Sequence, residues 1–119
     1  FGRVINPMLV AGQVHGGVVQ GLGQAVMENC VYDPETGQAL TASFTDYAMP
    51  RASDMPDIDF AYEEIPCKTH EMGAKGCGEA GTVGALPAFM SAVCDAIGVD
   101  HLDMPATPER VWRAMQAAA

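Results

Sequence analysis

The sequence predicts an α+β domain, a small mixed β-sheet packed against helices, and three observations lead to that fold class. Valine and leucine recur every four positions from Val14 to Val26, which is a helical spacing. Residues 82–97 form a second helical stretch, and Gly98 is placed to close it as a C′ residue. Side chains alternate in character over residues 58–64, as they do in a half-buried strand. A chain of 119 residues and 12.5 kDa is long enough for one domain with its own core.

The first helix is expected to run from Gln13 to about Asn29, although four glycines interrupt it. Each glycine costs about 1 kcal/mol relative to alanine inside a helix, so the missing side chains should let something approach closely. The other expected elements are a turn at 33–37, short strands at 39–43 and 46–49, an irregular loop at 66–81, and a helix that begins at Pro108 with Thr107 as its N-cap.

Composition excludes several classes of function. Fifteen acidic residues against six Lys and Arg give a net charge of −9, which argues against a nucleic-acid partner. The acids are concentrated in residues 33–64, whereas the two glycine-rich stretches are neutral. No apolar run approaches the ~20 residues of a membrane helix. The four cysteines form no Cys-x-x-Cys pair and are interpreted as reduced thiols, which predicts a cytoplasmic protein.

The loop before the second helix allows more than one interpretation. Gly76, Gly78 and Gly81 match the Gly-x-Gly-x-x-Gly pattern of a dinucleotide-binding module, and Asp95 or Asp100 stands near the position of a ribose-binding acid. That pattern should directly follow a buried strand, and Glu79 would bring a carboxylate next to a pyrophosphate. The alternative is that the loop presents Glu79 as a general base at a helix N-terminus. Spacing alone favours a third, simpler role, in which Glu79 only stabilises the helix through its dipole.

Gln13 is expected to head the first helix, with Gly17, Gln20 and Gln24 along the same side. These amides could bind a flat polar ligand, although the pattern alone favours a solvated helix face. His15 is interpreted as a structural histidine with satisfied hydrogen bonds. It has no partner at i+4, and we expect no protein ligands to a metal.

Together, these segments resemble the C-terminal part of the molybdopterin-binding large subunit of the molybdenum hydroxylases. This family includes xanthine dehydrogenase, aldehyde oxidoreductase and aerobic carbon monoxide dehydrogenase. Four blocks, in matching order and spacing, carry the resemblance: residues 2–7 (GRVINP), 12–23 (GQVHGG with QGLG), 46–52 (DYAMPRA) and 73–82 (GAKGCGEAGT). The resemblance covers nearly the whole of residues 1–119 and implies a segment of a molybdenum-cofactor-binding domain.

The resemblance also implies roles for particular residues. Glu79 corresponds to the catalytic base, which deprotonates a hydroxyl on molybdenum so that its oxygen attacks an electrophilic substrate carbon. Gln13 would bind the pterin, and the backbone at Gly76, Cys77 and Gly78 would pass close to the metal site. The cofactor would be molybdenum-molybdopterin, with its cytosine dinucleotide as one form, and the protein itself would provide no metal ligand.

The same resemblance predicts the partners. The family's large subunit is several hundred residues long, so the chain would need the remainder of that subunit and should be inactive alone. The 2Fe-2S and FAD centres would lie on other domains or on iron–sulfur and flavin subunits, and the substrate would be a small molecule such as an aldehyde, an N-heterocycle or carbon monoxide. The alternative from another class is a non-catalytic interaction or structural domain that keeps the loops without the activity.

Overall fold

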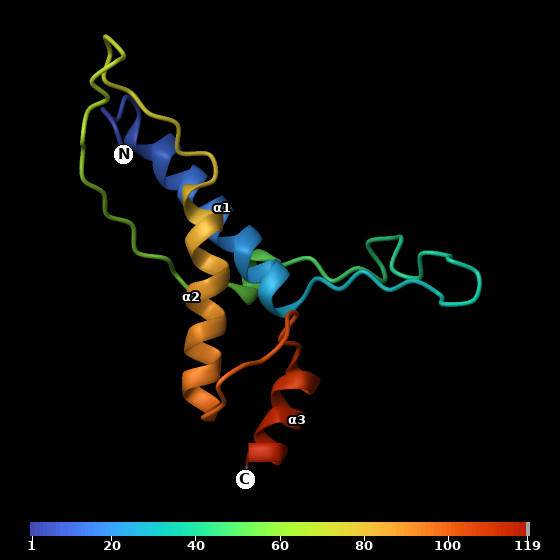
Figure 1. Cartoon of the computed structure of the whole chain (residues 1–119). Coiled ribbons are helices and arrows are strands. Elements are labelled where there is room, and N and C mark those ends of the chain that lie inside the picture. Colours follow the sequence, from blue (N-terminus) through green and yellow to red (C-terminus); the bar gives the residue numbers. More distant parts are fainter. Residues whose placement is uncertain (119) are drawn as a thin grey trace.

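The computed structural model describes residues 1–118, and its regular elements are helices. Figure 1 shows α1 (Pro7–Val26) crossing α2 (Ala80–Ile97), with α3 (Pro108–Ala118) beside the C-terminal end of α2. A short 3₁₀ helix, η1 (Ala52–Asp54), interrupts the long irregular connection between α1 and α2. This connection includes an arm that extends away from the helices, seen in cyan and green in Figure 1.

The predicted α+β class is wrong, because residues 1–118 contain no strand or sheet. The nearest approach to a sheet is an isolated bridge between Tyr32 and Ala39. Residues 58–64 are not a strand either, and the residue that pairs with their end is Phe1, which donates to Glu63 O at 3.2 Å and accepts from Ile65 N at 2.7 Å. Alternation of side chains predicts a half-buried face, but a strand also needs a neighbouring strand to bond with. In the described part of the chain, one residue, Phe1, provides that backbone pairing.

Helix α1 begins earlier than predicted. Asn6 is its N-cap and accepts a hydrogen bond from Leu9 N through Oδ1 at 3.1 Å, while Pro7 occupies the first turn. Gln13 therefore lies in the second turn of α1 and does not head it. At the other end, the backbone N–H groups of both Met27 and Glu28 donate to Gly23 O and end the helix before Asn29.

The other two helices agree closely with the prediction. Helix α2 starts at Ala80 and ends where Gly98 adopts φ +70°, the left-handed conformation that glycine tolerates at a helix C-terminus. It continues through Pro87, whose ring removes one backbone donor. Helix α3 begins at Pro108, and the Thr107 hydroxyl accepts from Arg110 N at 3.4 Å, as expected of an N-cap.

The predicted turn at 33–37 is confirmed. Asp33 Oδ1 accepts hydrogen bonds from the backbone N–H groups of Glu35 (2.9 Å) and Thr36 (2.7 Å) and from the Thr36 hydroxyl (3.0 Å). The bonds from Thr36 make the largest contribution to a pKa of the Asp33 carboxyl below its ordinary value. Gly37 closes the turn with φ +71°.

The expectation of a self-contained core is wrong. Among apolar side chains in the described residues, only Ala25 and Ala106 are buried. The accessible surface is 8602 Å², whereas a compact protein of this mass exposes about 6,200 Å². The radius of gyration is 18.1 Å, against about 13.5 Å for a compact chain of this length. Helix α2 is long and apolar enough to cross a membrane, with 6% of it buried, although a core helix of a larger soluble protein has the same length and composition.

Candidate functional site around the crossing of helices α1 and α2

Helices α1 and α2 cross at two glycines that leave no room for a side chain. A Cβ on Gly81 would contact the Val14 carbonyl oxygen and would lie 2.8 Å from Val18 N. A Cβ on Gly17 would lie 3.1 Å from both the Gly81 Cα and the Thr82 N. Both glycines are buried. The crossing is therefore a contact between backbones, which requires glycine on both helices.

The crossing continues along α1. The close approach predicted at its glycines is made by other segments of this same chain. A Cβ on Gly21 would lie 2.8 Å from the Ala85 Cβ on α2. A Cβ on Gly23 would lie 2.7 Å from Pro50 Cγ and would also contact the Glu28 carboxylate. The buried glycines of α1 therefore accommodate other parts of the same chain.

Glu28 also connects the end of α1 to the acidic stretch of residues 33–64. The Tyr47 hydroxyl donates a hydrogen bond of 2.6 Å to Glu28 Oε2. This bond, reinforced by burial and by the negative charge of Glu28, raises the pKa of Tyr47 to about 12.

The loop that leads into α2 is held by the N-terminal residues. Gly73 adopts φ +67°, and its carbonyl accepts from Arg3 N (2.9 Å) and Cys67 N (3.0 Å). A Cβ on Gly2 would lie 2.7 Å from Lys75 N, so the first and last of the four sequence blocks pack backbone against backbone. Segments far apart in the sequence thus fix where residues 76–79 begin.

The structure brings together candidate residues from α1 and from the loop before α2. Gln13 Nε2 donates to the Gly78 carbonyl at 3.5 Å, which places Gln13 next to the residue that precedes Glu79. Glu79 is exposed and occupies the N-cap position of α2, but its side chain makes no capping hydrogen bond. Its carboxylate therefore remains available to a ligand. Gln20 and Gln24 are exposed, as a solvated face would be.

The remaining candidates, Gly76 and Cys77, lie in the same loop. Cys77 is half-buried and lines a cavity of about 270 Å³ between the loop and the first ten residues. A Cβ added to Gly76 would meet no atom within 4 Å, and the same is true of Gly12 and Gly16 on α1. Packing within the described chain does not explain these three glycines, in contrast to Gly17.

His15 does not satisfy the expectation of a fully hydrogen-bonded histidine. Its ring packs edge-on against Phe60, with centroids 6.2 Å apart, and its buried Nε2 has no hydrogen-bond partner among the described residues. In residues 1–118 we also find no cluster of three or more His, Cys, Asp or Glu side chains arranged to hold a metal.

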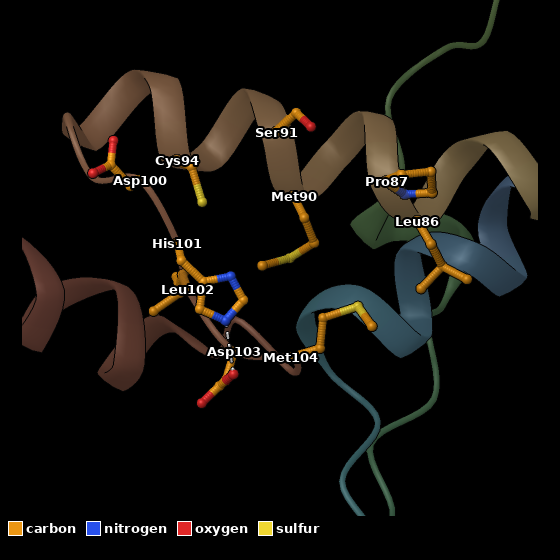
Figure 2. Close-up of a pocket in the computed structure, with 10 residues that line it drawn as sticks. All are labelled: Leu86, Pro87, Met90, Ser91, Cys94, Asp100, His101, Leu102, Asp103 and Met104. Carbon is orange, nitrogen blue, oxygen red and sulfur yellow. Dashed lines mark hydrogen bonds and ion pairs between the residues drawn. The ribbon is translucent and has the colours of Figure 1, made fainter.

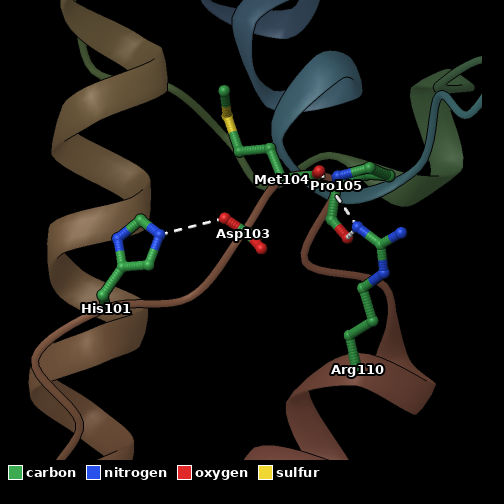
Figure 3. A network of polar contacts seen from close by, with 5 residues as sticks. All are labelled: His101, Asp103, Met104, Pro105 and Arg110. Carbon is green, nitrogen blue, oxygen red and sulfur yellow. Dashed lines mark hydrogen bonds and ion pairs between the residues drawn. The ribbon is translucent and has the colours of Figure 1, made fainter.

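A separate cavity of about 490 Å³ lies at the other end of α2 (Figure 2). Met90 and Cys94 line it from the helix, and the segment 100–104 closes one side. Figure 3 shows that His101 contacts Asp103 at 3.0 Å, where both side chains are largely exposed. Arg110 fixes the same segment by donating to the carbonyls of Met104 (3.0 Å) and Pro105 (3.2 Å). Asp100, the candidate ribose-binding acid of the dinucleotide interpretation, lines this cavity, whereas Gln13, Glu79 and the 76–78 loop do not.

Thr82 belongs to the site but was not expected there from the sequence. Its hydroxyl donates to the Gly17 carbonyl at 3.0 Å in a partly buried position beside the crossing. The signal that could have indicated it is a hydroxyl-bearing residue directly after Gly81, at the start of an otherwise apolar helix.

The crossing, the glycine-rich loop and the exposed Glu79 lie together at the start of α2, and comparison with known proteins identifies the family. Residues 1–56 match the molybdopterin cofactor-binding domain. The chain belongs to the molybdenum hydroxylase family, as a segment of its molybdopterin-binding large subunit.

Three relatives illustrate this membership. The chain is 44% identical over 118 residues to the gamma subunit of the 6-hydroxypseudooxynicotine dehydrogenase complex of Paenarthrobacter nicotinovorans, and 39% identical over 118 residues to the carbon monoxide dehydrogenase large chain of Hydrogenophaga pseudoflava. Each alignment covers 97% of this chain and 15% of the relative. The crystal structure of a Cu,Mo-CO dehydrogenase superposes with a TM-score of 0.90 at 38% identity, over 98% of this chain and 15% of that one. The chain therefore spans about one-seventh of its relatives' length.

Proposed function

We propose that this chain supplies the general base and part of the cofactor contacts of a molybdenum-dependent oxidoreductase. The reaction would hydroxylate an aldehyde, an N-heterocycle or a similar carbon centre with oxygen from water, or oxidise carbon monoxide. The observation that carries the proposal is the juxtaposition of Gln13 with Gly78, next to an exposed Glu79 that caps nothing. Because its carboxylate makes no capping hydrogen bond, Glu79 is free to accept a proton from a ligand.

The residues present fit a molybdenum-molybdopterin cofactor, either alone or as its cytosine dinucleotide. The Gln13 amide and the backbone of Gly76, Cys77 and Gly78 would hydrogen-bond the cofactor, and Gly12, Gly16 and Gly76 leave open space for it. When bound, the molybdenum centre would accept two electrons from the substrate. Glu79 would accept, on a carboxylate oxygen, the proton of the hydroxyl that supplies the product oxygen.

The dinucleotide-binding alternative is not supported. Its glycine pattern requires a strand directly before the loop, and residues 58–75 form none. A non-catalytic role for the segment makes a different prediction, because neither Glu79 nor its charge would then matter for turnover.

The apolar surface supports the remainder of the large subunit as the partner. A groove of about 610 Å³ runs between α2 and α3 and is lined almost entirely by apolar side chains, among them Phe89, Val93 and Trp112. Trp112 is 60% exposed, and a surface of this kind is normally covered by protein. The segment alone should be inactive. The 2Fe-2S and FAD centres would belong to other domains or subunits, the enzyme would be cytoplasmic, and the substrate would be a small molecule.

The test is Glu79→Gln in a complete large subunit assembled with its partners. Amidation keeps the side chain's size and removes its basicity, so turnover should fall by at least ~10²–10⁴-fold while bound molybdenum is retained. Glu71→Gln, at an exposed acid in the preceding loop, is the matched control and should keep full activity. Turnover of the Glu79 variant within a few-fold of wild type would eliminate the proposed base.

A further inference from the structure

The position of Glu79 is determined by the first turn of α2. Glu79 has helical backbone angles (φ −103°, ψ −1°), and its carbonyl accepts from Val83 N at 3.1 Å. Its backbone is thus part of the first turn of the helix. Any movement of this turn along or around α1 moves the carboxylate with it.

The contact that holds this turn against α1 is smooth. Gly17 and Gly81 meet through their backbones, and neither has a side chain that could interlock with the other helix. Such a contact permits a very short distance between helices, but dispersion between smooth surfaces changes little when one helix slides or rotates slightly. The Ala85 side chain packs at Gly21 further along α2, but at the first turn itself only a directional interaction can fix the register.

Two side-chain hydrogen bonds connect α1 with the start of α2 in the described part of the chain. The bond from Gln13 Nε2 to Gly78 O is 3.5 Å long and lies in an exposed position, at the limit for a hydrogen bond. The bond from Thr82 Oγ1 to Gly17 O is 3.0 Å long and partly buried. Shorter distance and poorer access to water make the Thr82 bond the stronger constraint.

We propose that Thr82 is a positioning residue, which fixes the register of α2 against α1 through the Gly17 carbonyl and thereby places the Glu79 carboxylate. This inference rests on the proposed function, because it assigns Thr82 a role through Glu79. Thr82 itself touches no reacting group. Because a misplacement of about 1 Å can cost ~10²-fold in rate, a small loss of register should be visible in catalysis.

The experiment compares Thr82→Val with Thr82→Ser in the complete, assembled enzyme. Valine keeps the branched shape and removes the hydroxyl, whereas serine keeps the hydroxyl and removes a methyl group. Thr45→Val is the matched control. Thr45 is exposed in the acidic stretch of residues 33–64, and the side-chain hydrogen bond described at this residue uses its backbone N–H, which donates to the Ser43 hydroxyl. Molybdenum content, kcat per bound molybdenum, and KM are measured for each variant, with Glu79→Gln alongside.

For Thr82→Val we expect kcat per molybdenum to fall about 10- to 100-fold, with molybdenum content and KM within about two-fold of wild type. Thr82→Ser should recover most of the activity, and Thr45→Val should match wild type. Thr82→Val with unchanged kcat, or with activity lost only in proportion to molybdenum, would overturn the positioning role. If Glu79→Gln were fully active, the proposed base itself would be wrong, which is a distinct result.

Discussion

Replacing Gly81 by alanine tests the helix crossing most directly. The added Cβ would lie 2.8 Å from Val18 N and 3.1 Å from Gly17 C, and would also contact the Val14 carbonyl oxygen. All three atoms belong to the backbone of α1, so the helices must separate. Overpacking of this kind costs about 1–3 kcal/mol, and we expect the upper end because no side chain can rotate away.

Alanine also favours the helix over glycine by about 1 kcal/mol, which leaves a net loss of about 2 kcal/mol for Gly81→Ala. Gly84→Ala is the control on the same helix, because its Cβ would meet nothing within 4 Å and only the gain of about 1 kcal/mol remains. Hydrogen exchange measured by mass spectrometry reports local opening of α1 and α2 inside the complete subunit.

These energies translate into exchange rates at a factor of ten per 1.4 kcal/mol. Amides of α1 and α2 next to the crossing should exchange about 30-fold faster in Gly81→Ala and about five-fold slower in Gly84→Ala. Equal exchange in the two variants would show that the helices do not approach each other as closely as the structure indicates.

Two further predictions concern other contacts. In Glu28→Gln, the pKa of Tyr47 should fall from about 12 toward 10.0, measured as the ultraviolet phenolate step that Tyr47→Phe removes; an unchanged step would argue against the pair. Because this pKa is raised, the pair's contribution to stability should be present below pH 10 and lost as the pH rises toward 12. Arg110→Ala removes two hydrogen bonds, to the Met104 and Pro105 carbonyls, each worth about 1 kcal/mol, so amide exchange in the loop before α3 should speed about 30-fold; exchange equal to wild type would mean that these bonds do not hold the loop.

The helices were predictable because their signals are local. Thr107, Pro108 and Gly98 act within one turn of the chain, and the structure uses them as the sequence indicates. The predicted start of α1 is too late because the apolar spacing begins only at Val14, whereas Asn6-Pro7 forms an N-cap followed by proline at the first helical position.

The strands were not predictable from alternation, because pairing is nonlocal. Residues 58–64 carry the right pattern, but in the described chain their rings pack around Phe1, with the Phe60 and Tyr62 centroids each 6.2 Å from it. The contact between Gln13 and Gly78 joins the two neutral, glycine-rich stretches, which lie 65 positions apart in the sequence. The hydrogen bond of Thr82 was not foreseen, since it depends on which face of α2 meets α1.

The long connection between α1 and α2 has a practical consequence. The entropy of closing a flexible loop grows only with the logarithm of its length, so about ten extra residues within residues 27–79 would cost on the order of 0.2 kcal/mol. The turn at 33–37 is largely exposed and lies on the arm, away from the crossing. A short peptide inserted after Gly37 should therefore leave the two helices in place, which makes this turn a suitable position for an affinity tag or a fluorescent label.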